Sequence, residues 1–336
     1  MTVLAQAPPI AWHRSRLLLG LALAIPSAVV IPIDPRLGLA LAVGVLPAAT
    51  TPLPPRRRGR VALPVLSVLF ALCLGFGALL GGHALPAVLG VFVLCIGASV
   101  AAERSRLGLL ALRLALPLVG IGLSFDDRAT VLATGALLLA GGLWAYLVAL
   151  AWPEQQLPAH PTRPAAEPEG TGASRRLAID YGIRLGLAAA IATGLGFAFH
   201  VDHKGWMCGA VLFVMRPNTD ALLARSLGRA GSVVLGGLLA ATCAELQPGL
   251  GWLAALIVVA VAALSATQGS RWYITPFFST FLVLTLMLYG DPGEGAMRFW
   301  QRSLETLIGV ALALLFGALI PYARNRRRTT GTPVHT

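Results

Sequence analysis

The chain is a succession of apolar stretches, each about as long as a membrane-crossing helix, separated by short segments rich in arginine. A spanning α-helix needs about 20 mostly apolar residues. Of the 336 residues, 57% are hydrophobic and only 12% are charged, whereas a soluble domain has roughly a quarter charged residues. Most of the apolar residues must therefore face lipid. The sequence predicts an all-α, polytopic membrane protein of about 12 transmembrane helices.

The apolar stretches divide into two groups of six on either side of a proline-rich segment. The expected spans are 16–33, 36–53, 60–81, 84–101, 106–124 and 129–151, then 178–199, 204–217, 230–245, 250–267, 272–290 and 302–322. Residues 153–176 hold five prolines and no apolar periodicity, which indicates a cytoplasmic linker. The expected domains are a membrane repeat at 1–152, this linker, a second membrane repeat at 177–324, and a disordered cytoplasmic tail at 325–336.

The positions of the basic residues predict the orientation. Nineteen of the 26 lysines and arginines lie at the chain ends, in the even-numbered loops or in the linker, and five lie in the odd-numbered loops. Cytoplasmic loops carry the excess of positive charge in membrane proteins. Both termini are therefore predicted to be cytoplasmic, in a multi-pass protein of the plasma membrane. The same clustering between apolar runs argues against nucleic acid as the reason for the net charge of +12.

The two groups of spans look like copies of one unit. A shift of 168 residues places Asp34-Pro35-Arg36 on Asp202-His203-Lys204 and Gly141 on Gly309. Because each copy has six helices, both copies would enter the membrane from the same side. The sequence predicts two parallel six-helix repeats related by an axis along the membrane normal.

Motifs for catalysis, cofactors and metals are not evident. The four cysteines fall inside apolar stretches without a C-x-x-C spacing, which favours small buried side chains over a metal site or disulfides. The sequence holds no Walker motif, and its glycine pairs do not follow a strand that would make a nucleotide site. We expect neither an enzyme nor a cofactor or metal site.

The stretch from Gly205 to Ala241 has a distinctive order: a short apolar helix ending in Arg-Pro, a polar turn, a basic segment, then Arg229 and a glycine-rich helix start. It resembles the fusaric-acid-resistance type of membrane protein, which is related to the aromatic acid exporters. The resemblance covers roughly residues 178–322 and is only architectural before them. It implies export of organic anions such as aromatic carboxylates. Many bacterial members have a large cytoplasmic domain that this sequence lacks, so the resemblance does not fix the substrate.

Arg113 is the clearest candidate for a substrate contact. It lies about eight residues into the fifth expected span, where a charge is costly and therefore a functional candidate. Its guanidinium suits a carboxylate ligand. The alternative is a structural ion pair or bonds to helix carbonyls. Arg184, near the start of the seventh span, is expected to extend its charge to the membrane surface.

The eighth expected span is short, and so is its counterpart near 36–49, which meets Pro47. Paired short or interrupted helices in two repeats are typical of a transport site, and broken helices at membrane depth are tolerated only at cavities or buried polar partners. Arg216, Asn218 and Arg229 are the substrate-binding candidates there, and Asp220 could neutralise an arginine and carry a proton. The alternative is an ordinary cytoplasmic turn.

Glu305 is expected one turn into the last span, three residues after Arg302. A carboxylate buried there could carry protons in coupled transport, or it could form an interfacial ion pair with Arg302. The sequence as a whole favours a transporter for a small organic anion. A membrane scaffold or envelope-assembly protein is the main alternative, and an enzyme acting on lipid-linked substrates is the third. The oligomeric state is not predicted.

Overall fold

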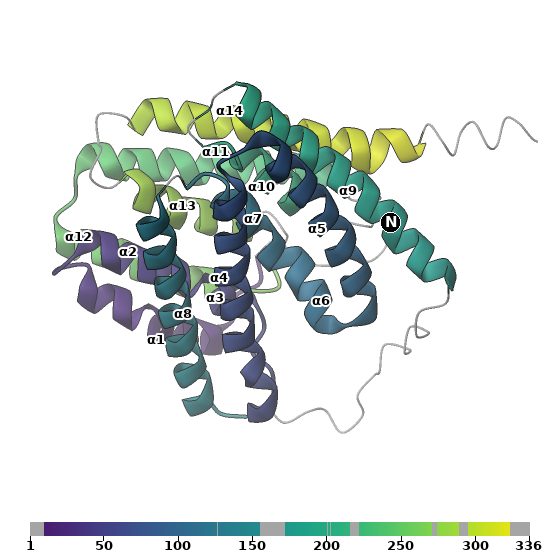
Figure 1. The fold of residues 1–336 in the computed structure, drawn as a ribbon. Helices are drawn as coiled ribbons and strands as arrows, with labels where there is room; N and C mark the ends of the chain where they lie inside the picture. Colours follow the sequence, from purple (N-terminus) through teal and green to yellow (C-terminus); the bar gives the residue numbers. More distant parts are fainter. Residues whose placement is uncertain are drawn as a thin grey trace, which may run out of the picture. The chain divides into compact units, whose positions relative to one another are not determined.

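The computed structural model describes residues 10–125, 127–154, 172–199, 201, 203–215, 222–270, 274–288 and 295–322, and its described elements are all helices. Every expected span falls on a helix, while the expected tail and residues 155–171 of the linker lie outside the described residues. The elements in Figure 1 are α1 (Arg14–Val30), α2 (Pro35–Gly44), α3 (Leu46–Thr50), η1 (Arg57–Val61), α4 (Ala62–Leu80), α5 (Ala84–Arg104), α6 (Arg106–Leu110), η2 (Ala111–Ala115), α7 (Leu116–Gly122), α8 (Arg128–Ala151), α9 (Gly172–Ala198), α10 (Trp206–Val214), α11 (Leu222–Leu246), α12 (Leu250–Ala266), α13 (Ile274–Leu288), α14 (Gly295–Leu314) and η4 (Leu315–Leu319).

Several helices are long and apolar enough to cross a bilayer. Among the described residues, five qualify by length and composition: Arg57–Leu80, Ala84–Arg104, Arg128–Ala151, Arg175–Ala198 and Ser303–Tyr322. Their exposed faces are apolar, as Leu85, Leu89 and Val93 show along α5. Helices with apolar exposed faces fit a lipid surround. The chain has the features of a multi-pass membrane protein, and the twelve-span, two-repeat arrangement stays a prediction.

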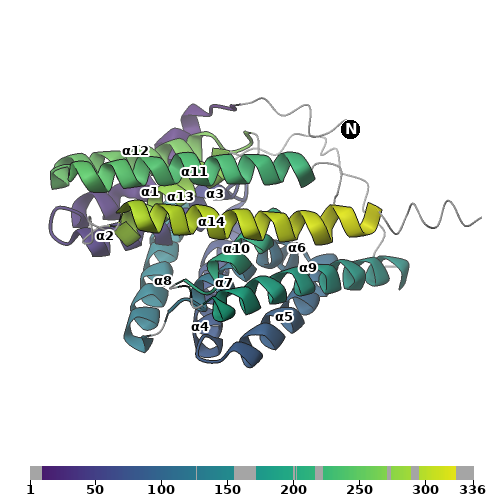
Figure 2. The same cartoon turned by 90° about the horizontal axis from the view of Figure 1, so that it is seen from above.

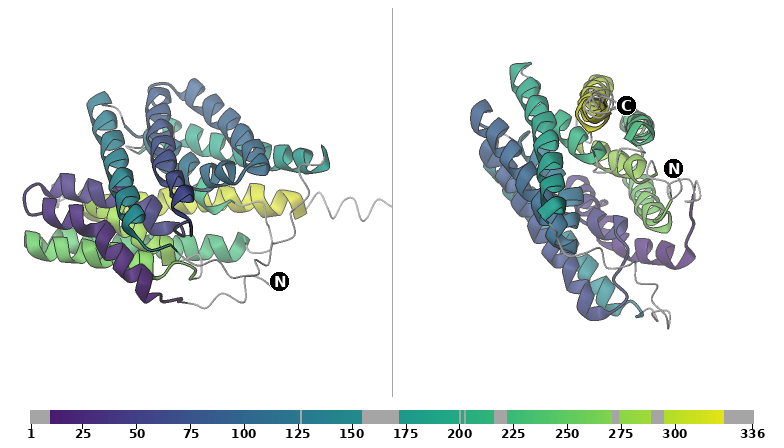
Figure 3. Two further views of the ribbon diagram at one scale, coloured as in Figure 1. Left: turned by 90° about the horizontal axis from the view of Figure 1, so that it is seen from below. Right: turned by 90° about the vertical axis from the view of Figure 1, so that its right-hand side faces the viewer.

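The chain divides into two compact units, and each takes segments from both halves of the sequence. Unit 1 consists of Met1–Gly75, Asp127–Glu169 and Gly228–Leu304, and unit 2 of Phe76–Asp126, Gly170–Leu227 and Glu305–Thr336. In unit 1, α1 lies antiparallel along α12 (Figure 3). A Cβ at Gly20 of α1 would be 2.7 Å from the Cα of Ala262. Small residues thus let these two backbones touch, as is common between helices in lipid.

In unit 2, α5 and α9 form the most extensive pair, and Figures 1 and 2 show them side by side. Gly182, Gly186 and Gly194 recur along the face of α9 that meets α5. A Cβ at Gly182 would be 2.9 Å from the Cα of Ile96, on the α5 backbone. The spacing of these glycines, four and then eight residues, puts them on one helix face, so the sequence determines which side of α9 packs.

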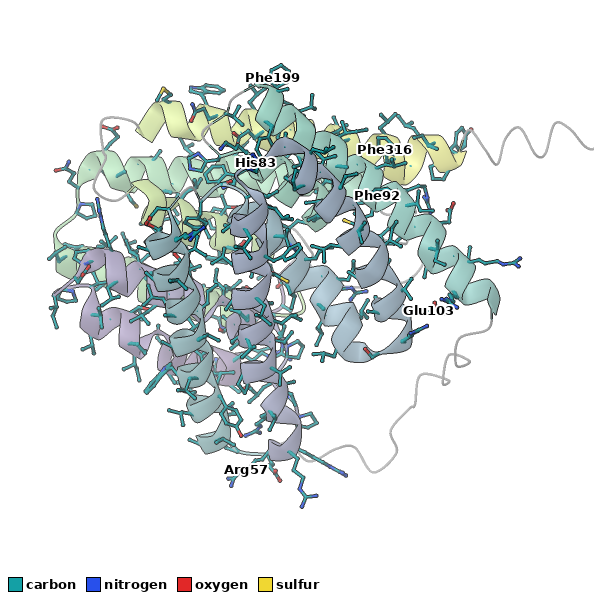
Figure 4. All side chains as sticks on the ribbon, viewed as in Figure 1. Arg57, His83, Phe92, Glu103, Phe199 and Phe316 are labelled. Carbon is teal, nitrogen blue, oxygen red and sulfur yellow. The ribbon has the colours of Figure 1, made fainter. Side chains whose placement is uncertain are left out.

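The loops of unit 2 gather at two ends in the way the charge pattern predicts. In Figure 4, His83 and Phe199 lie at one end of the α5–α9 pair and Glu103 at the other. His83 and Phe199 border odd-numbered loops, and Glu103 borders an even-numbered one. This alternation agrees with the predicted sidedness, while the cytoplasmic location of the termini remains a prediction.

A network of hydrogen bonds joins the segments that the charge pattern places on the cytoplasmic side of unit 1. The Ala11 N–H donates to Ser270 Oγ at 2.8 Å, and Arg16 Nη1 donates to the Gln268 carbonyl at 3.1 Å. Gln268 Nε2 in turn donates to the Ala49 carbonyl at the end of α3. The amino-terminal strap (residues 10–16), the α12–α13 loop and the end of α3 are thereby held together.

Arg60 stabilises this end of unit 1 through hydrogen bonds to backbone carbonyls. Its side chain is fully buried and donates to four carbonyls: Pro54 at 3.1 Å, Trp152 at 2.7 Å, Pro153 at 2.9 Å, and Ala149. Ala149 lies in the last turn of α8, which ends at Ala151, and Trp152 and Pro153 follow directly. An arginine that binds the last carbonyls of a helix also compensates the negative end of its dipole. Arg60 therefore ties η1 to the end of α8.

Three helices begin earlier than the apolar runs predict. α9 begins at Gly172 and takes in the end of the expected linker, α11 begins at Leu222, and α14 begins at Gly295. In each case the added residues include one or two arginines. Arginine is a good helix former. Basic residues can therefore mark the end of an apolar span while the helix continues through them.

Replacing Gly182 by alanine should destabilise the protein, because the new Cβ meets backbone atoms of α5 that cannot move without shifting the helix. We expect a loss of about 1–3 kcal/mol, measured as a lower thermal midpoint in detergent. Gly97→Ala on α5 is the matched control, since its Cβ meets nothing within 4 Å, and alanine favours a helix over glycine. A midpoint for Gly182→Ala equal to that of Gly97→Ala would contradict the close α5–α9 contact.

Replacing Arg60 by methionine should remove these four hydrogen bonds, of which the one to the Ala149 carbonyl is buried, and lower stability by about 1–3 kcal/mol. The exposed Arg57, three residues earlier, is the control, and Arg57→Met should change stability by less than about 0.5 kcal/mol. Thermal unfolding of both variants in detergent measures the difference. Equal midpoints would show that Arg60 does not hold the end of α8.

Candidate functional site

Helix α10 is a short helix enclosed by protein. Its nine residues extend about 13 Å, less than half of a hydrocarbon core of about 30 Å. Eight of the nine are buried, and only Phe213 is partly exposed. The eighth expected span therefore contains a short helix, as the sequence predicts, and its interruption at membrane depth stays a prediction. A helix that ends at such depth needs other partners for its terminal backbone groups.

The amino-terminal end of α10 is held against α7. The Gly205 N–H donates to Ser124 Oγ at 3.1 Å. A Cβ at Gly120 would be 2.8 Å from both the Gly205 carbonyl oxygen and the Gly209 nitrogen. The backbones of α7 and α10 thus touch, and any side chain larger than hydrogen at Gly120 would force them apart.

The carboxyl-terminal end of α10 is held by a tyrosine of α9. Met215 leaves the helix in an extended conformation, and its carbonyl accepts a hydrogen bond from the Tyr181 hydroxyl at 3.0 Å. Both residues are buried. The predicted cluster of Arg216, Asn218 and Asp220 lies outside the described residues.

Arg113 lies on a π-helical turn, η2, whose cause can be read from the sequence. Pro117 has no N–H to donate to the Arg113 carbonyl, and its ring would clash with that carbonyl in a regular helix. The ladder therefore widens, and the Leu116 N–H bonds to the Ala111 carbonyl five residues back. Such π-bulges frequently occur at functional sites. The Arg113 side chain is exposed and makes no hydrogen bond or ion pair within the described part of the chain. The predicted alternative of a structural ion pair is therefore not seen among these residues.

The acidic candidate Glu305 sits deeper in its helix than the sequence suggested. Because α14 begins at Gly295, Glu305 is ten residues into the helix instead of one turn, and it is only 5% exposed. One turn further along, Gly309 meets α10, where a Cβ would lie 2.6 Å from the Met207 carbonyl oxygen. Residues four apart share a helix face, so Glu305 lies on the side of α14 that turns toward α10.

A second polar group accompanies Glu305. The Thr306 hydroxyl is buried, with the residue 1% exposed, and has no hydrogen-bond partner among the described residues. A buried hydroxyl without a partner is costly. The Arg302 side chain lies outside the described residues, so the predicted Arg302–Glu305 pair is untested.

The remaining charged candidates separate from this group. Arg229 lies within α11, in unit 1, and its side chain is outside the described residues. Arg184 forms an ion pair with Asp180 on its own helix at 3.1 Å, with side chains 19% and 49% exposed. That Arg184 extends its charge to the membrane surface stays a prediction. No group of three or more potential metal ligands occurs among the described residues.

Tyr181 and Ser124 are the polar residues at the ends of α10 that the sequence did not reveal. Each is a lone polar side chain in an ordinary context, one within a helix and the other in a loop. The short eighth span was itself a signal that partners for its ends must exist. Nothing in the sequence says which residues supply them.

Comparison with known families adds to this geometry. Residues 189–316 match the model of the family described as fusaric acid resistance protein-like. The predicted resemblance is confirmed. This fusaric acid resistance protein-like region includes the whole of α10, the Arg216–Asp220 segment, Arg229 and Glu305, whereas Arg113 precedes it. No curated protein and no solved structure gives a match.

Removing the Tyr181 hydroxyl should loosen the end of α10, because the buried Met215 carbonyl loses a donor. We expect Tyr181→Phe to lower stability by about 1–3 kcal/mol and to speed hydrogen–deuterium exchange in peptides that contain α10. Tyr322→Phe is the matched control, since Tyr322 is 68% exposed. Unchanged exchange in α10 for both variants would argue against this role of Tyr181.

Proposed function

We propose that the protein is a transporter of the plasma membrane that exports small organic anions such as aromatic carboxylates. The observation that carries the proposal is α10, a short buried helix in the family-matched region that ends where an Arg-Pro polar segment begins. Interrupted helices of this kind hold substrate sites in many transporters. The family match supports transport in general, and the charges of the chain suggest the kind of substrate.

An anionic substrate suits the balance of charge near the interrupted helix. Arg113, Arg216 and Asn218 are the proposed substrate contacts near this helix, and their guanidinium or amide donors match carboxylate oxygens. Arg229, which belongs to unit 1, stays a separate candidate. Arg113 supports this assignment best, because its exposed guanidinium lies on a π-turn next to the helix that packs on α10. A cation in the middle of a membrane helix faces a polar partner or a water-filled path in preference to lipid.

Glu305 and Asp220 are the proposed proton carriers. A carboxyl group alternates between its charged and neutral forms at modest cost when burial disfavours the charge. Glu305 meets this condition, because it is buried in the middle of α14 on the side that turns toward α10. Asp220 belongs to the polar segment that follows α10. Proton coupling would let the membrane gradient drive export without a nucleotide site.

Substitution of Arg113 tests the substrate contact. In proteoliposomes loaded with radiolabelled benzoate, Arg113→Ala should lower efflux about 10- to 100-fold, the range expected for loss of a hydrogen bond to a charged group. Arg113→Lys should retain part of the rate. Arg128→Ala, which removes an exposed arginine at the start of α8, should leave efflux unchanged. Equal efflux by all variants, or none by the wild type, would count against the proposal.

Substitution of Glu305 tests the coupling separately. Glu305→Gln should abolish transport driven by an imposed pH gradient while benzoate exchange without a gradient continues, because the neutral amide cannot release a proton. Glu305→Asp is the control that keeps the titratable group. If Glu305→Gln responded to the gradient as the wild type does, Glu305 would have no part in the coupling, and the substrate assignment would be unaffected.

A further inference from the structure

Three consecutive arginines, Arg56, Arg57 and Arg58, are exposed on the turn that leads into α4. Figure 4 shows Arg57 at the end of the α4 ribbon, away from the body of the helix. None of the three guanidinium groups forms a hydrogen bond or an ion pair within the described part of the chain. Three like charges on neighbouring residues repel one another. Their close placement therefore calls for an anion.

The turn that carries them is held in place by its fourth arginine. The buried Arg60 side chain donates to four carbonyls. These bonds fix the turn to the end of α8 two residues after Arg58. The nearby carboxylate of Glu154 accepts a hydrogen bond from the Arg57 backbone N–H at 2.8 Å. Glu154 thus fixes the backbone of the turn. A preorganised set of donors binds a ligand better than a flexible one.

A second basic and aromatic element lies at the same end of unit 1. The amino-terminal strap carries Trp12, which is 54% exposed, and the exposed Arg14. The strap is connected to the end of α3 through Arg16, Gln268 and Ala49. Exposed tryptophan and arginine are typical of the membrane–water interface. The strap and the arginine turn are both on the side that the charge pattern predicts to be cytoplasmic.

We propose that Arg56, Arg57 and Arg58, together with the amino-terminal strap, form a binding surface for the headgroup phosphates of anionic phospholipids in the cytoplasmic leaflet. Guanidinium forks match phosphate oxygens in geometry and charge. Clusters of basic residues next to a membrane helix attract anionic lipid. The exposed Trp12 of the strap suits the same headgroup layer. The proposal does not depend on what the protein transports.

Lipid titrations of the purified full-length protein in detergent test the proposal. Dioleoylphosphatidylglycerol should raise the thermal midpoint, and dioleoylphosphatidylcholine at the same concentration should not. The variant Arg57→Gln/Arg58→Gln should need at least tenfold more phosphatidylglycerol for the same rise, since each basic residue near an anionic surface contributes roughly fivefold. The Arg57 backbone contact with Glu154 remains in this variant.

The matched control removes the same charge elsewhere in unit 1. Arg36→Gln/Arg128→Gln takes two exposed arginines from the starts of α2 and α8 and should respond to phosphatidylglycerol as the wild type does. Equal weakening of both double variants would overturn the proposal, because the effect would then be that of net charge. An equal rise with inorganic phosphate would also overturn it, in favour of a free-anion site. The comparison of the two lipids on the wild type decides the question even if a variant does not fold, since an absent phosphatidylglycerol effect refutes it.

Discussion

The structure depends on satisfying backbone polar groups wherever a helix is interrupted, because lipid offers them no hydrogen bonds. Each interruption is met by a specific partner. The Tyr181 hydroxyl donates to the carbonyl at the end of α10, and Ser124 Oγ accepts from the N–H at its start. Arg60 donates to the carbonyls at the end of α8. At Pro117 the ladder itself adjusts by widening to a π-turn.

Glycine determines where these breaks can lie. Gly120 lets α7 touch the start of α10, and Gly309 lets α14 touch its middle. Such contacts leave little space around α10 for lipid, which explains why a helix too short to cross the membrane is buried almost entirely. The same contacts bring the face of α14 that carries Glu305 toward α10. The contact at Gly309 therefore accounts both for the close packing of α10 and for the placement of Glu305.

The positions of the helices could be predicted from the sequence, but the partners at their ends could not. Each apolar run predicted as a span falls on helix, whereas the π-turn beside Arg113, which Pro117 explains, was not predicted. The helices α9, α11 and α14 begin before the predicted spans, because basic residues that end a membrane span can continue a helix. Arg60 could not be told from Arg56, Arg57 and Arg58, since burial of one arginine in a run depends on carbonyls 89 or more residues away.

Each of the two compact units combines helices from both halves of the sequence. Unit 2 packs α5 from the first half against α9 from the second, and it places α7 against α10 in the same way. The glycine faces of α9 and α10 would have no partner without the first half. Arg113 and Glu305 also come from different halves but belong to this one unit. The packing of α10 requires both halves of the sequence, because α7 comes from the first half and α9 and α14 come from the second.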